Sequence, residues 1–227
     1  MKLSPTNKAR LVALIICVFL LIVTLLTDKC NGPTKEQKAT FTHIYVTVFD
    51  RGSVRASDEL LEIMDMDRDH TITMNDALLY SHKALAKSTD YAAQDGTITK
   101  LWGVENAAYR LYVNNTEVTD LMTPIAELDE IALRIEEIGS GTETELLFDP
   151  LVCKAAKEEE HTLALYSERD GERTPLGHHA VLVDGEDTGL VTNERGEVTL
   201  SFPYAATYVI TAGEEECTDA LCLFIVG

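Results

Sequence analysis

The sequence is short of positive charge. Lys and Arg together number 19 against 38 Asp and Glu, which gives a formal net charge of −19 at pH 7. A surface with such an excess of acid repels nucleic acid and anionic lipid. We therefore expect no nucleic-acid partner, and we expect most of the carboxylates to be solvated.

The sequence also lacks the motifs of common catalytic sites. It contains no nucleophile elbow, no phosphate-binding loop and no zinc-protease helix motif. The pair His178-His179 and the run Glu158–His161 do not have the ligand spacing of a built metal site. These absences favour a protein that is not an enzyme.

Only one long apolar run is present, LVALIICVFLLIVTLLT at residues 11–27, and no acid precedes it. Seventeen residues are at the lower limit for a membrane-spanning helix, and the basic residues in 1–10 are expected to stay in the cytoplasm. The residues after the run are not the small ones that a cleavage site prefers. We expect an uncleaved signal anchor with the remainder of the chain outside the cytoplasm, and a cleaved signal peptide is the alternative.

Cysteine is scarce, with five in the chain. Cys17 lies in the apolar run, and the other four lie in the part expected outside the cytoplasm, where disulfides can form. Four cysteines allow three pairings, and the sequence does not choose among them. The four are Cys30, Cys153, Cys217 and Cys222.

The patterning after the anchor predicts a mainly β (α+β) protein of two domains. We expect a polar linker at 28–39, a first domain at 40–138, a second linker at 139–145 and a second domain at 146–227. In the first domain, apolar residues on both faces of 41–50 predict a central strand. Helical spacing predicts a helix at 76–87, and Ser57-Asp58-Glu59 is a helix-start signal. Further strands are expected at 97–104, 108–113 and 130–137, with a turn at Asn114-Asn115.

The second domain shows only strand signals. Short strand candidates recur at 161–167, 178–184, 197–202, 206–212 and 220–226, and turn residues separate them. Regular short strands without a helical pattern are typical of an immunoglobulin-like β-sandwich.

The stretch DMDRDHTITMND, residues 65–76, has the spacing of a calcium-binding loop. Such loops use side-chain oxygens at positions 1, 3, 5 and 12, a backbone carbonyl at position 7 and a water-mediated contact at position 9. The predicted ligands of Ca²⁺ are therefore Asp65, Asp67, Asp69, Thr71, Thr73 and Asp76. A solvated acidic turn that caps the following helix is the alternative.

Two positions of this loop depart from the usual pattern. Position 6 normally requires glycine for a positive φ, and here it is His70. Position 12 is the shorter Asp76 instead of glutamate. Both changes should weaken calcium binding, although extracellular modules function at roughly 10⁻⁴–10⁻³ M. The loop resembles that of dockerins, but only one such loop is present, so cohesin binding does not carry over.

The order VFD, DMDRDHTITMNDAL, TKLWGV and YRLYVNN resembles a family of surface proteins from Gram-positive gut bacteria. The core domain of that family resembles the C-terminal β-domain of transcobalamin and intrinsic factor. The resemblance implies a β-grasp-like sheet with one helix over about residues 40–138, and GEDTGLVTNERGEVTLSFPYAATYVITA resembles the β-sandwich that often follows. It also suggests Trp102 with Tyr109 or Tyr112 as a platform for a flat, corrinoid-like ligand, and burial of Trp102 in the core is the alternative.

These observations together predict a non-enzymatic protein anchored in the membrane by its N-terminal helix. The expected role is adhesion, display or assembly at the cell surface through an extracellular protein or glycan partner, with structural calcium. Capture of a small ligand and membership of a larger envelope complex are the alternatives.

Overall fold

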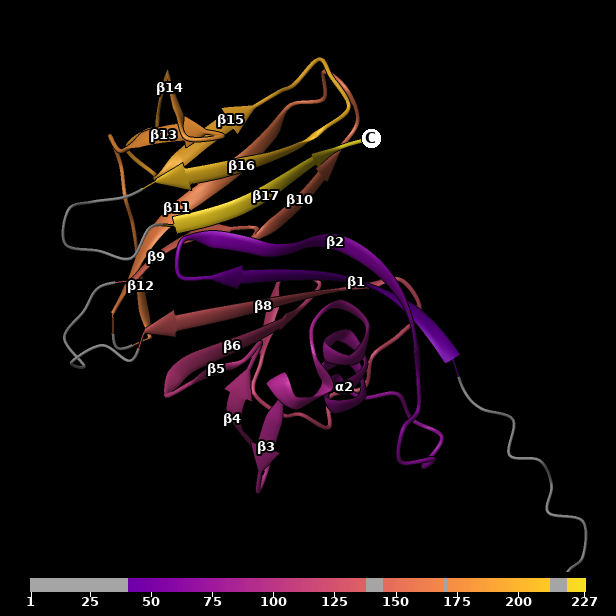
Figure 1. Cartoon of the computed structure of the whole chain (residues 1–227). Helices are drawn as coiled ribbons and strands as arrows, with labels where there is room; N and C mark the ends of the chain where they lie inside the picture. The colour runs from indigo at the N-terminus through magenta and orange to yellow at the C-terminus, as the bar shows by residue number, and fades with distance from the viewer. Residues whose placement is uncertain (1–40, 138–144, 170, 213–219) are drawn as a thin grey trace, which may run out of the picture. The chain divides into compact units, whose positions relative to one another are not determined.

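The computed structural model describes residues 41–137, 145–169, 171–212 and 220–227 (Figure 1). Contacts divide the chain into residues 1–39 and one compact unit, residues 40–227. The stub at 1–10, the anchor at 11–27, the linker at 28–39 and nearly all of the linker at 139–145 lie outside the described residues. Among the described residues, no helix has the length and apolar character needed to cross a bilayer.

The first half of the compact unit is a five-stranded mixed sheet in the order β2-β1-β8-β6-β7. Strands β1 and β8 are parallel, and the other neighbours are antiparallel. The strands are β1 (Phe41–Asp50), β2 (Ser53–Met64), β6 (Ala107–Val113), β7 (Thr116–Val118) and β8 (Asp129–Glu137). The expected central strand at 41–50 is thus confirmed, since β1 has a neighbour on each side.

One α-helix, α2 (Met74–Leu85), packs on the sheet. The buried side chains Ile44, Val46 and Val48 of β1 form a core with Ala77 and Leu78 of the helix. The expected helix at 76–87 is confirmed, with both ends shifted by two residues. A 3₁₀ turn, η1 (Ser88–Asp90), follows it.

The helix expected after Ser57 is wrong, because residues 53–64 form strand β2. This segment pairs with β1 along its length, from Asp50 opposite Ser53 to Phe41 opposite Met64. Sheet pairing and burial of Ile63 decide the conformation against the local start signal, as tertiary context commonly does.

The single strand expected at 97–104 is instead two strands, β4 and β5, of a small three-stranded sheet. Its members are β3 (Ala92–Gln94), β4 (Thr97–Leu101) and β5 (Val104–Glu105). Leu101 is opposite Val104, so Trp102 and Gly103 form a two-residue turn with φ of 52° and 78°. Positive φ at both turn residues matches the twist of a β-hairpin. The same geometry occurs at Asn114 and Asn115, with φ of 49° and 61°, which confirms the turn expected there.

The second half of the unit contains two further sheets. One has the order β10-β17-β16-β13-β14, and the other contains β12, β11 and β15, with β9 also paired to β11. The strands are β9 (Glu145–Asp149), β10 (Val152–Ala155), β11 (His161–Arg169), β12 (Glu172–Pro175), β13 (Ala180–Val183), β14 (Glu186–Val191), β15 (Glu197–Leu200), β16 (Thr207–Ala212) and β17 (Ala220–Val226). A separate apolar core lies between these strands and includes Phe148, Leu163 and Phe224. The five strand segments expected here are present.

Two of the cysteines are described, and both are buried free thiols. Cys153 of β10 is opposite Phe224 of the parallel strand β17, so Cys222 is two residues out of register with it. A diagonal of this kind is roughly 8 Å between Cα atoms, beyond the reach of a disulfide. Burial raises the pKa of Cys153 to about 11, so its thiol is protonated at neutral pH.

The two halves share a third apolar cluster, here called the joint. It combines Phe49, Tyr112 and Ala132 of the first sheet with Leu151, Val152, Leu221 and Leu223 of the second half. At one side of the joint, Asn115 Oδ1 accepts hydrogen bonds from the amides of Leu151 and Val152, each at 3.0 Å. At another side of the joint, Arg110 forms ion pairs with Glu145 and Glu168 at 3.1 and 2.5 Å. The joint makes residues 41–137 and 145–227 neighbours in one folded unit.

Candidate metal centre

In the loop at residues 65–76, backbone amides of the loop donate hydrogen bonds to its first carboxylate, Asp65. Asp65 Oδ1 accepts the amide of Arg68 at 2.6 Å, and Asp65 Oδ2 accepts the amide of His70 at 2.8 Å. These bonds wrap the chain around the first carboxylate of the loop. Burial acts to raise the pKa of Asp65, but the amides of His70 and Arg68 outweigh it and lower the pKa.

His70 has the conformation that the sixth position of a calcium loop requires. Its φ is 76°, in the left-handed region, and Arg68 also has a positive φ of 66°. A left-handed conformation at a residue with a β-carbon costs roughly 1–2 kcal/mol. The turn normally made by glycine is therefore formed here by a histidine under strain.

Three carboxylates converge inside the loop. Asp65, Asp67 and Asp76 each have an oxygen within 4.8 Å of an oxygen of both others. Asp69 lies outside this group, and its Oδ1 accepts the amide of Thr71 at 2.7 Å. The pKa of Asp67 is raised: the amide of Asp69 lowers it, but burial and the neighbouring carboxylates outweigh that bond. The charges of Asp69 and Asp76 are among the causes that raise this pKa, after burial and the contact with Asp65.

The predicted ligands at positions 9 and 12 also begin the helix. Thr73 is the N-cap of α2, and its hydroxyl donates to Asp76 Oδ2 at 2.8 Å. Asp76 Oδ2 also accepts the amide of Thr73 at 2.9 Å, and Asp76 Oδ1 accepts the amide of Met66 at 3.0 Å. Asp76 therefore caps the helix while its other oxygen faces the loop, so the capping role and the metal role are compatible in one side chain.

The loop is tied to a segment that the sequence did not suggest. Ile125 donates its amide to the carbonyl of Ile72 at 2.8 Å, and Met74 donates to the carbonyl of Thr123 at 2.9 Å. Ile72, at the eighth position of the loop, is buried in the first core. The segment that pairs with the loop is the strap 119–128 between β7 and β8, and no local pattern in that strap indicates it.

The three aromatic residues suggested for a flat ligand do not form one platform. Trp102 is 8% exposed, and its indole packs edge-on against His82 with 4.4 Å between ring centroids. Tyr112 lies in the joint on the opposite face of the sheet from this core. Tyr109 packs against the same core as Trp102 and donates its hydroxyl to the carbonyl of Val104 at 2.8 Å. Trp102 is thus a member of the core, which was the alternative given for it.

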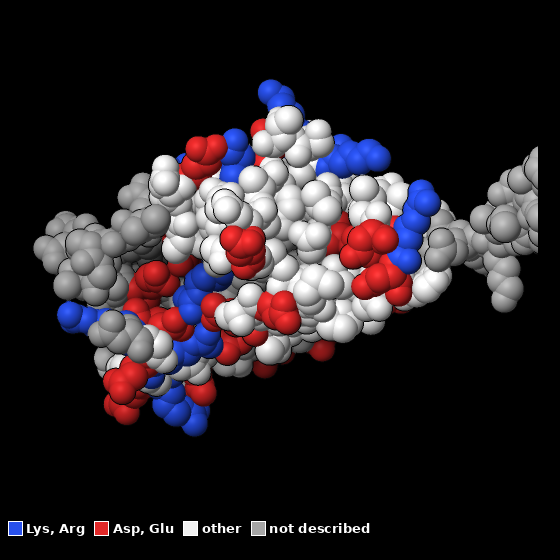
Figure 2. Space-filling view, turned by 90° about the horizontal axis from the view of Figure 1, so that it is seen from below, with Lys and Arg blue, Asp and Glu red and all other residues white. Residues whose placement is uncertain are grey.

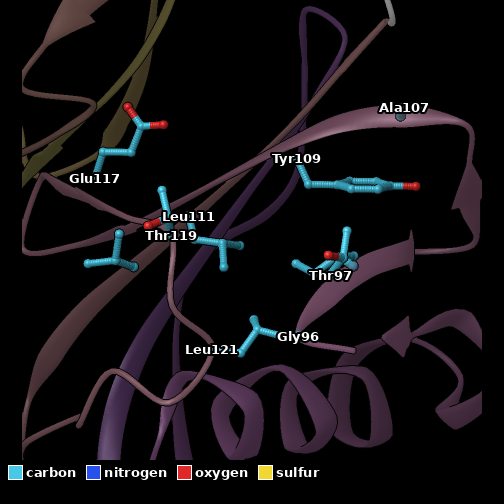
Figure 3. Close-up of a pocket in the computed structure, with 10 residues that line it drawn as sticks. Gly96, Thr97, Ala107, Tyr109, Leu111, Glu117, Thr119 and Leu121 are labelled. Atoms are coloured by element: carbon cyan, nitrogen blue, oxygen red, sulfur yellow. The ribbon is translucent and has the colours of Figure 1, made fainter. Parts of the chain in front are cut away.

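A shallow cavity of about 340 Å³ lies beside Tyr109, between the β3–β4 hairpin and the edge of the first sheet. Figure 3 shows the ring of Tyr109 along one side, Thr97 and Leu121 near the hairpin, and Glu117 at the far end. The other lining residues are small or apolar, and no titratable cluster converges there. The cavity holds no arrangement of groups suited to catalysis.

Charge on the first sheet's helix side is scattered. Figure 2 views the molecule from below and shows a largely uncharged middle, with acidic and basic side chains interleaved towards both ends.

No family model and no curated protein matches this chain. Among solved structures, the N-terminal four immunoglobulin domains of Dscam1 isoform 7.44 match 82% of this chain and 44% of that chain, at 9% identity and a TM-score of 0.28. Isoform 6.9 of the same protein matches 60% of this chain and 32% of that chain, at 10% identity and the same TM-score of 0.28. The chain thus spans about a third to under half the length of those Dscam1 structures.

The D00-D0 domain of intimin matches 82% of this chain and all of that chain, at 14% identity and a TM-score of 0.24. TM-scores this low do not assign a fold. What the described residues define by themselves is a mainly β protein with one α-helix and two apolar cores linked by a joint.

Proposed function

We propose that this chain is a calcium-stabilised, non-enzymatic module of the cell surface, anchored by residues 11–27. Its role would be adhesion, display or assembly. The finer fold description is part of the proposal: a β-grasp-like domain at 40–138 and an immunoglobulin-like sandwich at 146–227. The single mixed sheet with α2 across it, and the helix-free strands of the second half, support this description.

The observation that carries the calcium proposal is the wrapped conformation of the loop. Asp65 accepts the amides of residues four and six of the loop, and His70 is left-handed at the position where calcium loops turn. The carboxylate oxygens that converge within 4.8 Å are the hard donors that Ca²⁺ prefers. Crowding of like charges there is relieved when a cation binds.

The side chains of Asp65, Asp67, Asp69 and Asp76 would hold the ion, with the carbonyl of Thr71 and a water near Thr73. Bound calcium supplies positive charge that fixes the loop, and the chain's own contacts then extend this order. The hydrogen bonds that the amide of Met74 and the carbonyl of Ile72 make with the strap 119–128 would fix the position of that strap as well. The role proposed for calcium is therefore structural.

The test is thermal unfolding of the full chain in mild detergent, with millimolar calcium and with chelator. At ten times the dissociation constant, mass action gives about 1.4 kcal/mol of stabilisation, or a midpoint shift of about 3–6 °C for a chain of this size. The Asp65→Ala, Asp67→Ala double variant should lose the shift. The Glu160→Ala, Glu194→Ala double variant removes the same charge at exposed positions elsewhere and should keep it. Absence of a shift in the unmodified chain would overturn the calcium proposal.

A further inference from the structure

The outer face of the first sheet is only partly covered. Alternation along β1 places Phe41, His43, Tyr45 and Phe49 on the side away from α2. Phe49 is buried in the joint, whereas Phe41 is 51% exposed. The second half of the unit therefore covers one end of this face and leaves the other end open.

We call this open end the uncovered face. Tyr45 is opposite Leu60, His43 opposite Glu62 and Phe41 opposite Met64 in the β1–β2 pairing. The amide of Leu128 donates to the carbonyl of His43 at 2.7 Å, which places Leu128 beside the same row. The face comprises Phe41, His43, Tyr45, Leu60, Glu62, Met64 and Leu128.

The uncovered face concentrates exposed apolar side chains. Leu60 is 54% exposed and Leu128 is 55% exposed, in addition to Phe41. Phe41 and Leu60 lie on the adjacent strands β1 and β2, and Leu128 lies just before β8. Several large apolar side chains exposed on one face of a sheet indicate a site of association.

Carboxylates dominate the charges around this face, and Lys154 at its boundary is itself paired with two of them. Glu62 and Glu127 flank the ring of His43, at 3.5 and 3.0 Å, and their side chains are 60% and 57% exposed. Residues 41–45, 60–64 and 127–131 contain no Lys or Arg. Lys154 marks the covered boundary, where its ammonium lies 3.5 Å from the ring centroid of Tyr45 and pairs with Asp58 and Glu130.

The sign of these charges selects the occupant. A second copy of the chain would bring Glu62 and Glu127 of both copies together, and each chain already carries a net charge of −19. An anionic bilayer is repelled in the same way. A partner whose apolar side chains are interspersed with Lys or Arg complements both the exposed apolar side chains of this face and the carboxylates that lie among them.

We propose that the uncovered face is the docking site for a protein segment of this chemistry: apolar side chains flanked by Lys or Arg. The inference rests on the proposed role in adhesion or assembly and names the partner class for it. The inference does not depend on the calcium loop. A negative result in the unfolding experiment above would leave the docking proposal standing, and a negative result in the binding experiment below would leave the calcium proposal standing.

Selection from a library of random twelve-residue peptides, with the full chain in zwitterionic nanodiscs, tests the proposal. Empty nanodiscs serve for counter-selection. We expect selected peptides to be enriched in apolar residues together with Lys or Arg. Their dissociation constants should rise about tenfold or more for the Leu60→Ser, Leu128→Ser double variant, because each exposed leucine loses its apolar contact.

A matched control is available on the second half of the unit. Val191 and Tyr204 are 51% and 74% exposed, and a Val191→Ser, Tyr204→Ser double variant should leave peptide binding unchanged. Because all four positions are surface residues, both double variants should retain the circular dichroism spectrum and unfolding midpoint of the unmodified chain.

Three results would overturn the proposal. One is selected peptides without basic residues, or an equal affinity for all variants. Another is a dimer in sedimentation that the Leu60→Ser, Leu128→Ser variant abolishes, which would assign the face to a second copy. The third is flotation of detergent-free chain with phosphatidylcholine vesicles in a manner that depends on Leu60 and Leu128, which would assign it to lipid.

Discussion

The imidazole of His82 accepts a hydrogen bond from the backbone amide of Trp102, with 2.9 Å between Nε2 and the amide nitrogen. The other ring nitrogen, Nδ1, lies 2.7 Å from the carbonyl of Leu78 and must carry the proton. Trp102 occupies a turn position that asparagine or glycine usually takes, with φ of 52°. The histidine therefore ties a strained turn to α2 by a bond that only its neutral form can make.

Replacing His82 with phenylalanine should destabilise the protein. The substitution keeps a ring but leaves the buried amide of Trp102 without an acceptor, which costs roughly 1–3 kcal/mol. Urea unfolding followed by the fluorescence of Trp102, the single tryptophan, measures the change directly. Equal stability of the two proteins at pH 7.5 would show that the bond contributes nothing.

The same pair should give the protein a pH dependence on the acid side. Burial lowers the pKa of His82 below its ordinary value of 6.5. The unfolded chain then binds a proton that the folded chain does not, so stability is lost as pH falls below 6.5. The difference in unfolding free energy between the unmodified chain and His82→Phe should shrink between pH 7.5 and pH 5. A difference that stays constant over this range contradicts the assignment.

Glu136 should produce the opposite trend. Its carboxylate is 4% exposed, and Arg134 Nη2 lies 2.9 Å from Oε1. Burial raises the pKa of Glu136 to about 7; the charge of Arg134 opposes this shift, and Glu145 across the joint adds to it. The folded chain therefore binds more protons than the unfolded chain between pH 4.5 and pH 7, and stability falls as pH rises through that window.

Glu136→Gln removes this ionisation and keeps the shape of the side chain. We expect the variant to be more stable than the unmodified chain at pH 8, by on the order of 3 kcal/mol, and to match it near pH 4.5. Glu172→Gln, on exposed strand β12, is the control and should change neither value. Guanidinium unfolding at the two pH values decides the matter, and a variant less stable at pH 8 would refute the prediction.

Asn115 should be a main contributor to the joint. Asn115→Gly retains the left-handed turn but removes two bonds to the amides of Leu151 and Val152 and one to the carbonyl of Val152. We expect a loss of roughly 2–4 kcal/mol, since these backbone groups are left without partners. Hydrogen exchange at Leu151 and Val152 should accelerate. Asn114→Gly, at the neighbouring turn position with bonds only inside the first sheet, should leave exchange at those two amides unchanged.

His70→Gly should strengthen the proposed metal site. Glycine adopts the observed φ of 76° without strain, so the variant should gain about 1 kcal/mol of stability and bind calcium several-fold more tightly. Isothermal titration with calcium measures the affinity, and Gly171, already left-handed in an exposed turn, marks a position where Gly171→Ala should leave it unaltered. A weaker affinity in His70→Gly would mean that the imidazole itself serves the loop.

Local pattern was sufficient for the elements whose partners are close in the chain. Helical spacing before Leu85 and Asn114-Asn115 between two strands each encode a structure that forms from neighbouring residues. Alternation in 41–50 indicated the strand itself but not its distant neighbour β8. The aspartate spacing likewise indicated the loop, and the bonds from Asp65 to the amides of Arg68 and His70 lie within it.

What the sequence did not reveal depends on distant contacts. Residues 53–64 carry a helix-start signal, yet they form β2 because β1 offers a strand edge and a core. Arg110 and Glu168 are 58 residues apart, and no periodicity announces their ion pair. The tie between Ile72 and Ile125 is of the same kind. The sequence pattern predicted a strand at Trp102. The turn found there is stabilised by the bond between the Trp102 amide and His82, which is 20 residues away in the chain.

The position of β17 bears on when the second core can form. Residues Ala220–Val226 lie inside their sheet, with β10 on one side and β16 on the other. Until this late segment has been synthesised, β10 has no neighbour in the sheet and β16 has only β13. The first sheet can assemble earlier, because all of its strands precede residue 138. During this interval the side chains of Phe49 and Tyr112 remain exposed, and a chain truncated before residue 220 would retain that exposed apolar surface permanently and be prone to aggregation.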